Sequence, residues 1–292
     1  MNIISDIGNK YQEFEMLGFG KALTHIGHDF LFIKRKEKAI LDAFAEKTPQ
    51  IFFTYFNFID RATIKAIIQN KKCKTFIFIE NEEQIEKLKK IENIIFISNK
   101  NINGIKNIEP SCDIFNTLKP KSDDNLKSDI CYIGDYKNNF ILNKFINNYK
   151  TKVFSNELWP HINNIGKIKN NKIKDVIFSS KLSVYDDNCE NFSWPLYVYM
   201  CERPVINFKS IALNNLLNKN DIYVNNDNEF NNILVKIINN DNEYKELISL
   251  NKKYIQNNHL CHNRISDILN YAGFEEESLK CLNAAKEIIK KY

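Results

Sequence analysis

Apolar residues recur along most of the chain in short blocks that alternate with longer amphipathic stretches. In the first hundred residues, five such blocks are rich in β-branched and aromatic residues, which is typical of buried strands. The stretches between the blocks carry apolar residues at helical spacing. The predicted strands are Asn2–Ser5, Phe30–Ile33, Ile51–Phe56, Thr75–Ile79 and Ile94–Ile97, and the predicted helices are Tyr11–Ile26, Ala39–Ala45, Ala62–Gln69 and Glu82–Ile91. This alternation predicts a doubly wound parallel sheet.

The pattern breaks between residues 99 and 128, where Gly104, Pro110 and Pro120 accompany a polar run. Glycine and proline in a polar stretch are typical of a linker. The alternation then resumes and gives way to helices alone. The later predicted strands are Ile130–Ile133, Lys152–Phe154, Leu182–Tyr185, Pro204–Asn207 and Ile222–Val224, and the later helices are Phe140–Tyr149, Trp194–Cys201, Ala212–Leu217, Glu229–Ile238 and those between Tyr244 and Tyr292.

We therefore predict two Rossmann-like, doubly wound parallel-sheet domains that face a cleft, followed by C-terminal helices. The predicted domains are residues 1–120 and 121–272, and residues 273–292 are predicted to form a final helix that packs back across the domains. Parallel sheets bind ligands at the loops that leave the carboxyl ends of their strands. The polar loop Asp186–Ser193 follows a predicted strand and precedes a predicted helix, so we expect a ligand there.

Composition narrows the class of protein. A hydrophobic fraction of 43% suffices for packed cores, and 41 basic against 36 acidic residues leave a net charge of only +5, which is not typical of a dedicated nucleic-acid binder. The opening residues do not resemble a signal peptide, and no apolar run reaches the ~18 residues of a membrane span. The seven cysteines are scattered and never spaced as C-x-x-C. We expect a cytoplasmic protein with reduced thiols and no zinc site.

Four motifs follow one another along the later part of the chain. They are EPSCDIFNTLKP (Glu109–Pro120) followed by SDICYIGDY (Ser128–Tyr136), FSSKLSVY (Phe178–Tyr185), YMCERPVIN (Tyr199–Asn207), and His259 spaced five residues before Arg264. In this order they resemble the GT-B glycosyltransferases, in particular the spore-maturation-protein (CgeB-type) branch within glycosyltransferase group 1. A looser similarity lies in KALTHIGHDF (Lys21–Phe30), which is similar to the Ala-Leu…Gly-His start of many GT-B enzymes.

This resemblance implies transfer of a sugar from a nucleoside-diphosphate sugar, most simply a UDP-sugar, to an acceptor hydroxyl, with no further cofactor. The donor-binding residues that it implies are Gly8, Gly134, Asn191, Ser193, Trp194 and Tyr197. Two positions depart from the family pattern. Tyr197 stands where many GT-B enzymes have a ribose-binding glutamate, and Glu202 stands where the family has glycine before Pro-Val-Ile.

Several of these residues also have simpler interpretations. Gly8 and Gly134 suit any tight turn. Ser193 can serve as the N-cap of a helix that has Pro195 in its first turn, and Trp194 can belong to the aromatic core. Lys181 precedes its strand and is expected to lie away from the carboxyl end, and His259 and Arg264 are expected to form a buried ion pair or a cap.

The catalytic base is open at this level. A carboxylate or imidazole near the acceptor hydroxyl is needed for an inverting transfer. Asp6 and Glu80 are the predicted catalytic carboxylates, Tyr55 lies at a similar strand end, and Glu13 and His28 are placed less well. The chain has no Asp-x-Asp motif of metal-dependent transferases, so we predict no metal site and metal-independent transfer.

Three functions remain open. The first is transfer to a glycan, protein or lipid acceptor, and the second is transfer to modified bases of DNA. The third is a catalytically inactive GT-B domain that serves as a binding or assembly module, which the departures at Tyr197 and Glu202 favour.

Overall fold

The structure is a computed structural model of the whole chain. It describes residues 1–6, 10–33, 40–133, 148–154, 172–185, 193–208, 217, 222–239, 242 and 244–291. The described chain forms two compact units, one made of residues 1–111 and 261–291 and the other of residues 112–260. None of the described helices combines the length and the apolar character that a membrane crossing requires.

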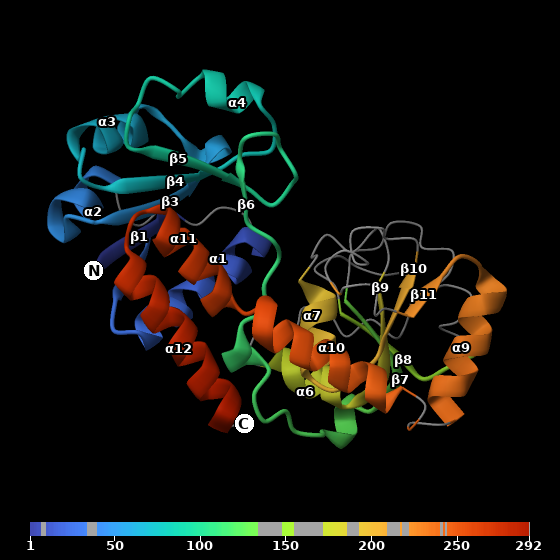
Figure 1. The fold of residues 1–292 in the computed structure, drawn as a ribbon. Helices are drawn as coiled ribbons and strands as arrows, with labels where there is room; N and C mark the ends of the chain where they lie inside the picture. Colours follow the sequence, from blue (N-terminus) through green and yellow to red (C-terminus); the bar gives the residue numbers. More distant parts are fainter. Residues whose placement is uncertain are drawn as a thin grey trace. The chain divides into compact units, whose positions relative to one another are not determined.

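The first unit contains a parallel sheet with helices on both faces (Figure 1). Its strand order is β2-β1-β3-β4-β5-β6, so the chain winds one way from β1 to β2 and the other way from β3 onward. The strands are β1 (Asn2–Asp6), β2 (Asp29–Ile33), β3 (Ile51–Tyr55), β4 (Lys74–Phe78), β5 (Ile94–Ser98) and β6 (Lys106–Asn107). The helices are α1 (Lys10–His25), α2 (Ile40–Lys47), α3 (Arg61–Gln69), α4 (Glu83–Glu86), α11 (Cys261–Tyr271) and α12 (Glu275–Lys291).

Alternate strand residues divide the core of this unit into two layers. Ile3, Ile51 and Phe53 pack with α1, α11 and α12 on one face, while Ile4 and Phe52 pack with α2 and α3 on the other. Figure 1 shows α11 and α12, in red, beside the blue helix α1 on the face opposite α2 and α3. Because both faces are covered, the strands are apolar throughout, as expected of a parallel sheet.

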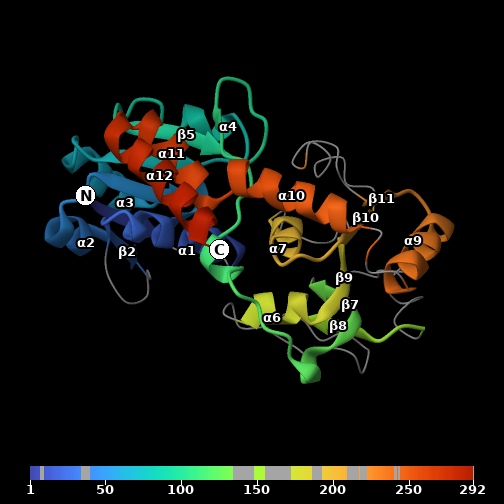
Figure 2. The same cartoon turned by 60° about the horizontal axis from the view of Figure 1, so that its bottom comes forward.

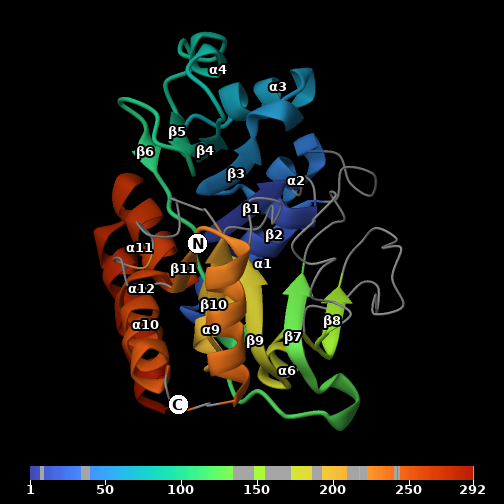
Figure 3. The same ribbon diagram turned by 90° about the vertical axis from the view of Figure 1, so that its right-hand side faces the viewer.

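The second unit also contains a parallel sheet, with the order β11-β10-β9-β7-β8. Figure 3 shows β7, β8 and β9 running in the same direction. The strands are β7 (Ser128–Ile133), β8 (Thr151–Phe154), β9 (Ser180–Tyr185), β10 (Val205–Phe208) and β11 (Ile222–Val224). The described helices are α6 (Ile173–Phe178), α7 (Trp194–Met200), α9 (Asp227–Asn239) and α10 (Lys245–Asn258). Helix α10 packs against α7, as Figure 2 shows.

The end of α7 explains how Glu202 fits where the family pattern has glycine. The Arg203 N–H donates to the Val198 carbonyl at 3.1 Å, and the Glu202 N–H donates to the Tyr199 carbonyl at 3.0 Å. This pair of bonds is the Schellman motif, which requires a left-handed residue after the helix. Glu202 adopts that conformation, with φ of 60°. The turn that the resemblance implies is therefore present, with a strained glutamate in place of glycine.

The predicted elements agree with the observed strands to within two residues at most ends, and Gly27, with φ of 87°, ends α1 as expected. Two differences concern helices. The helix predicted over Glu82–Ile91 is confined to Glu83–Glu86, because only Gln84 and Leu88 of this stretch are buried and little core holds it. The sequence analysis did not predict helix α6, because six residues make fewer than two helical turns and show no repeating pattern. The helices predicted over Phe140–Tyr149 and Ala212–Leu217 lie almost entirely outside the described residues.

The division into units also differs from the boundaries drawn on the sequence, at residues 120 and 272. The chain passes from the first unit to the second after Ser111. Cys112 already belongs to the second unit, where its N–H donates to the His259 carbonyl at 2.7 Å. The return falls after Leu260, because α11 buries Ile265, Ile268 and Leu269 in the core of the first unit. Two terminal helices, and not one, therefore complete the first unit.

We predict that Glu202→Gly is more stable than Glu202→Ala. Both variants lose the carboxylate that pairs with Lys252, so the difference between their free energies of unfolding reports the backbone strain at position 202. An L residue at φ of 60° is strained by about 1 kcal/mol relative to glycine. The measurement is the free energy of unfolding in urea. The same pair of substitutions at Lys253, on the exposed side of α10, is the control, and there alanine is expected to be the more stable by about 1 kcal/mol. The same order of stability of the glycine and alanine variants at both positions would contradict the left-handed conformation of Glu202.

Candidate functional site

Each sheet has a point where the chain reverses its winding, and ligands of such sheets bind outside the carboxyl ends of the strands at that point. In the first unit it lies between β1 and β3, whose last residues are Asp6 and Tyr55. In the second unit it lies between β7 and β9, whose last residues are Ile133 and Tyr185. The carboxyl edge of each sheet is therefore a candidate site, and each is described by itself.

The predicted donor residues of the second unit divide into two groups. Gly134 and Asn191 lie outside the described residues, as does most of the loop Asp186–Ser193. Ser193 and Trp194 are described and buried, at the start of α7. Ser193 holds the N-cap position, but its side chain makes no capping hydrogen bond to the helix. Their role in donor binding therefore stays a prediction.

Trp194 is part of the core of this unit. Its indole N–H donates to the Ser183 hydroxyl at 3.1 Å, and that hydroxyl donates to the Cys131 carbonyl at 2.8 Å. The chain of bonds ties α7 to β9 and β7. A buried indole needs such a partner for its N–H, so Trp194 fixes the position of the helix start beside the carboxyl edge.

Tyr197, at the position of the family glutamate, is 2% exposed. Its hydroxyl accepts a hydrogen bond of 2.9 Å from the backbone N–H of Asp113. Asp113 in turn accepts from the Phe115 N–H at 3.0 Å and caps the short 3₁₀ helix Ile114–Asn116. Tyr197 therefore anchors the first segment of the second unit to α7, a structural use that the sequence did not indicate.

In the first unit, the two predicted catalytic carboxylates occupy different surroundings. Asp6 is wholly buried and accepts a hydrogen bond of 3.4 Å from the Thr54 hydroxyl. Glu80 is exposed just beyond β4, where its backbone N–H donates to the Gln84 side chain at 2.9 Å. Gly8 lies outside the described residues. The catalytic roles of Asp6 and Glu80 stay predictions.

Glu15 is the residue of this edge that sequence reasoning missed. It lies on α1, one turn before the buried Phe19, and its side chain is partly buried. Burial raises the pKa of its carboxyl from 4.5 to about 7, against the opposing attraction of Arg264. An acidic residue one turn from a buried phenylalanine was the available signal, because the two share a helix face.

Tyr55 lies close enough to Glu15 to feel its charge. Burial, with a smaller contribution from Glu15, holds the pKa of the Tyr55 phenol well above its usual range, so the hydroxyl keeps its proton. Among the described residues, this buried hydroxyl has no hydrogen-bond partner. Its ring stacks on Phe78 with centroids 4.7 Å apart, which fixes the phenol at the carboxyl edge of the sheet.

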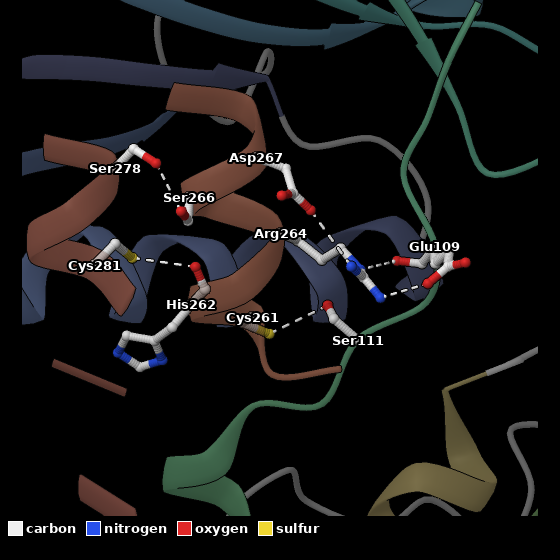
Figure 4. Close-up of polar contacts among 9 residues, drawn as sticks. All are labelled: Glu109, Ser111, Cys261, His262, Arg264, Ser266, Asp267, Ser278 and Cys281. Atoms are coloured by element: carbon white, nitrogen blue, oxygen red, sulfur yellow. Dashed lines mark hydrogen bonds and ion pairs between the residues drawn. The ribbon is translucent and has the colours of Figure 1, made fainter. Parts of the chain in front are cut away.

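Arg264 brings a cation to this edge from the far end of the chain (Figure 4). Its Nη2 donates to the Glu109 carboxylate at 2.8 Å and its Nε to the Glu109 carbonyl at 3.0 Å. Its Nη1 lies 3.4 Å from Asp267. Arg264 is 7% exposed whereas the Glu109 side chain is half exposed, so the expected ion pair is present and is buried on the Arg264 side.

The structure also describes several other residues that the sequence analysis singled out. His259 is buried and follows α10 as its C-cap residue, and Lys181 lies at the amino end of β9, where it pairs with Asp129 at 3.1 Å. The six described cysteines are buried and form no disulfide with one another, and Cys189 lies outside the described residues. His28 comes directly before the amino end of β2 and contacts Glu277 at 3.2 Å. Within the described ranges, no three His, Cys, Asp or Glu side chains are grouped to hold a metal ion.

Comparison with solved structures decides the fold. No protein-family model matches the chain, and no curated protein matches it in sequence. An alpha-glucosyltransferase in complex with UDP and a 13-mer DNA superposes with a TM-score of 0.66 at 10% identity, over 94% of this chain and 99% of that one. The fold is that of the GT-B glycosyltransferases.

Two further solved structures share this fold over nearly their whole lengths. A glycosyltransferase from Rickettsia africae gives a TM-score of 0.64 at 11% identity, over 96% of this chain and 98% of that one. Anabaena HepE in complex with UDP and glucose gives 0.62 at 9% identity, over 94% and 99%. The predicted fold class is therefore confirmed, while the CgeB-type branch is not distinguished by these structures.

We predict that Tyr197→Phe lowers the free energy of unfolding by about 1–3 kcal/mol, because it leaves the buried N–H of Asp113 without this acceptor. Urea unfolding measures the change. Tyr254→Phe is the matched control, since the Tyr254 hydroxyl makes no hydrogen bond among the described residues, and a change below about 0.5 kcal/mol is expected there. Equal effects of the two substitutions would refute the anchoring role of Tyr197.

We predict that Glu15→Gln stabilises the protein increasingly as the pH rises from 4.5 to 7. Below pH 4.5 the folded and unfolded states both hold the proton. Between pH 4.5 and about 7 the unfolded state loses it while the folded state keeps it, so the wild-type free energy of unfolding falls. The gain at pH 8 is expected to be about 1–3 kcal/mol.

Urea unfolding at pH 5 and pH 8 tests this expectation. Glu92→Gln, at an exposed turn, is the control and should shift neither value by more than about 0.5 kcal/mol. The gain in stability of Glu15→Gln over wild type is expected to be larger at pH 8 than at pH 5. A smaller gain at pH 8 would show that the folded protein does not hold the Glu15 carboxyl in its protonated form.

Proposed function

We propose that the protein is a glycosyltransferase that moves a sugar from a UDP-sugar to an acceptor hydroxyl. The observation that carries the proposal is the match to UDP-bound GT-B structures over 94% of this chain and 99% of theirs. In the proposal, the donor binds at the carboxyl edge of the second sheet, near Ser193, and Trp194 and Tyr197 hold α7 in place beside it. The CgeB-type branch, suggested by the motif order, is the finer assignment that we propose.

We propose Glu15 as the residue that accepts the proton of the acceptor hydroxyl. In a direct displacement, the hydroxyl oxygen forms a bond to the anomeric carbon while the bond from that carbon to the diphosphate breaks. The electron pair of the broken bond leaves with UDP, and the hydroxyl proton passes to the carboxylate. A base with a pKa near neutrality is suited to this step at physiological pH.

Two neighbours of Glu15 support this assignment. The Tyr55 hydroxyl is buried without a partner among the described residues, so it can donate a hydrogen bond to an incoming acceptor oxygen. Arg264 provides a positive charge near the carboxylate, held in position by Glu109. Asp6 and Glu80 are the alternative bases, as expected from the sequence.

Transfer to DNA is a second candidate function. The solved structure with a TM-score of 0.66 is a complex of an alpha-glucosyltransferase with DNA, which favours including this acceptor class. An inactive binding module is the third candidate. The departure at Glu202 gives it little support, because the backbone turn is retained there.

We predict that the full chain releases UDP from at least one UDP-sugar and that Glu15→Gln lowers the rate by about 100-fold or more, as expected for loss of a general base. Coupled detection of UDP over a panel of UDP-, GDP- and TDP-sugars gives the rate. Unfolding of each variant is measured alongside, because Glu15→Gln is expected to be at least as stable as wild type at pH 8. An inactive Glu15→Gln variant therefore cannot be attributed to misfolding.

Asp6→Asn and Glu80→Gln run in the same assay, and a larger loss for either one than for Glu15→Gln would reassign the base. The acceptor arms are water, simple sugars and DNA that contains hydroxymethylated cytosine. A chelator is expected to leave the rate within about twofold. No release from any donor would refute the transferase and favour the binding module.

A further inference from the structure

A cationic pocket lies at the amino edge of the second sheet, at the opposite end of the strands from the proposed donor site. Its wall includes Ser128 and Ser180, the first residues of β7 and β9, and Lys150 and Pro204, which come directly before β8 and β10. A six-residue strand such as β9 spans about 17 Å, so this pocket is separate from the carboxyl edge.

The pocket has a volume of about 800 Å³, which lies within the range of small-molecule sites. Six basic and two acidic side chains line it, although the whole chain has a net charge of only +5. The lining therefore has four more basic than acidic side chains, and the sequence did not reveal this cluster because the residues come from five separate segments. The basic residues are Lys127, Lys150, Lys181, Arg203, Lys245 and Lys252.

Two of these cations are open to a ligand. Lys181 pairs with Asp129, Lys252 pairs with Glu202, and Lys127 pairs with Asp124. The ammonium groups of Lys150 and Lys245 form no ion pair or hydrogen bond among the described residues, and both side chains are exposed.

Arg203 makes structural contacts in the wall of the pocket. Its guanidinium donates to the Phe178 carbonyl at 2.7 Å and to the Ser180 carbonyl at 2.6 Å, and it stacks on the Phe178 ring with its carbon 4.5 Å from the centroid. These contacts hold the end of α6, the start of β9 and the turn after α7 together. The wall is thus rigid and keeps a fixed positive charge.

Hydroxyl groups add donors to the cations. The Ser128 side-chain oxygen is buried and has no hydrogen-bond partner among the described residues, and Ser128 is 7% exposed. The Ser179 hydroxyl accepts from the Asp123 N–H at 2.9 Å, which leaves its own hydrogen available. Hydroxyl and ammonium donors around one cavity match the oxygens of a phosphate group.

Part of the wall is apolar and aromatic. Tyr244, Ile237, Ile248 and Pro204 line the pocket together with Phe178. Inorganic phosphate has no apolar surface to cover these side chains, whereas a phosphorylated organic molecule does. A concave, partly apolar cavity is also unlike the exposed basic stripes that follow a nucleic-acid backbone.

We propose that this amino-edge pocket binds a small organic phosphate, with its phosphate between Lys150 and Lys245 and its organic part against Tyr244 and Phe178. The proposal does not depend on the transferase function, because it concerns a different end of the sheet. A ligand here would contact β7, β9 and α10 at once, and so would stabilise the second unit by binding the folded state alone.

We predict that phenyl phosphate binds the full chain at this pocket. Isothermal titration calorimetry is expected to give an affinity about tenfold lower for the double variant Lys150→Gln/Lys245→Gln than for wild type. Lys253→Gln is the matched control, since Lys253 is exposed on α10 but does not line the pocket, and it should bind as wild type does. An unchanged affinity in the double variant would overturn the proposal.

A second measurement locates the ligand without any substitution. The rate of acetylation of each lysine amine is followed by mass spectrometry with phenyl phosphate, with inorganic phosphate and with a short DNA duplex. Phenyl phosphate is expected to protect Lys150 and Lys245 but not Lys253, and at lower concentration than inorganic phosphate. Equal protection by the two phosphates would overturn the organic part of the proposal. Protection by DNA alone would overturn it entirely and assign the pocket to nucleic acid.

Discussion

The return of the C-terminal helices to the first sheet is the constraint on which the rest of this structure depends. Helix α11 places Ile265, Ile268 and Leu269 in the same core layer as the α1 residue Phe19 and the β1 residue Ile3. Each fully buried aliphatic side chain contributes about 1.5–3 kcal/mol relative to exposure, so this layer accounts for much of the unit's stability. The first unit is thus completed only when residues 261–291 are in place, and its two segments are joined through the whole second unit.

The packing of α11 on the first sheet also positions the polar residues near Glu15. Arg264 sits on α11 beside the apolar residues that bury the helix, so packing of the helix fixes the guanidinium against Glu109, 155 residues earlier in the chain. Neighbouring bonds hold the same region: Ser111 contacts Cys261 at 3.4 Å, and Ser266 contacts Ser278 at 2.7 Å (Figure 4). The charge near Glu15 is therefore positioned by hydrophobic packing and polar contacts together.

This dependence explains which features the sequence could predict. Strands such as Ile51–Tyr55 and Ile222–Val224 follow from local apolar blocks, and the parallel fold follows from their alternation with helices. The motif order led to the GT-B fold, which the solved structures confirm. The roles of Tyr197 and the amino-edge pocket depend on contacts across many residues, and no local pattern encodes them. For Glu15 the local signal is its position one helical turn before Phe19. The loop residues Gly134 and Asn191 lie outside the described residues, so their predicted roles rest on the sequence alone.

The balance of charges around Glu15 shows why the site has a carboxyl that holds its proton near neutral pH. A nearby arginine by itself lowers a carboxyl pKa, because it favours the ionised form. Here Arg264 already donates to the carboxylate and the backbone carbonyl of Glu109 and lies 3.4 Å from Asp267. Its positive charge therefore acts on the carboxylates of Glu109 and Asp267 as well as on Glu15. Burial of Glu15 among the helices is then the larger effect, and the pKa rises to about 7. The fold tolerates the cost of burying the Glu15 carboxyl because two chain segments together hold the surrounding layer of apolar side chains. A carboxyl with a pKa of about 7 can release or accept a proton at neutral pH.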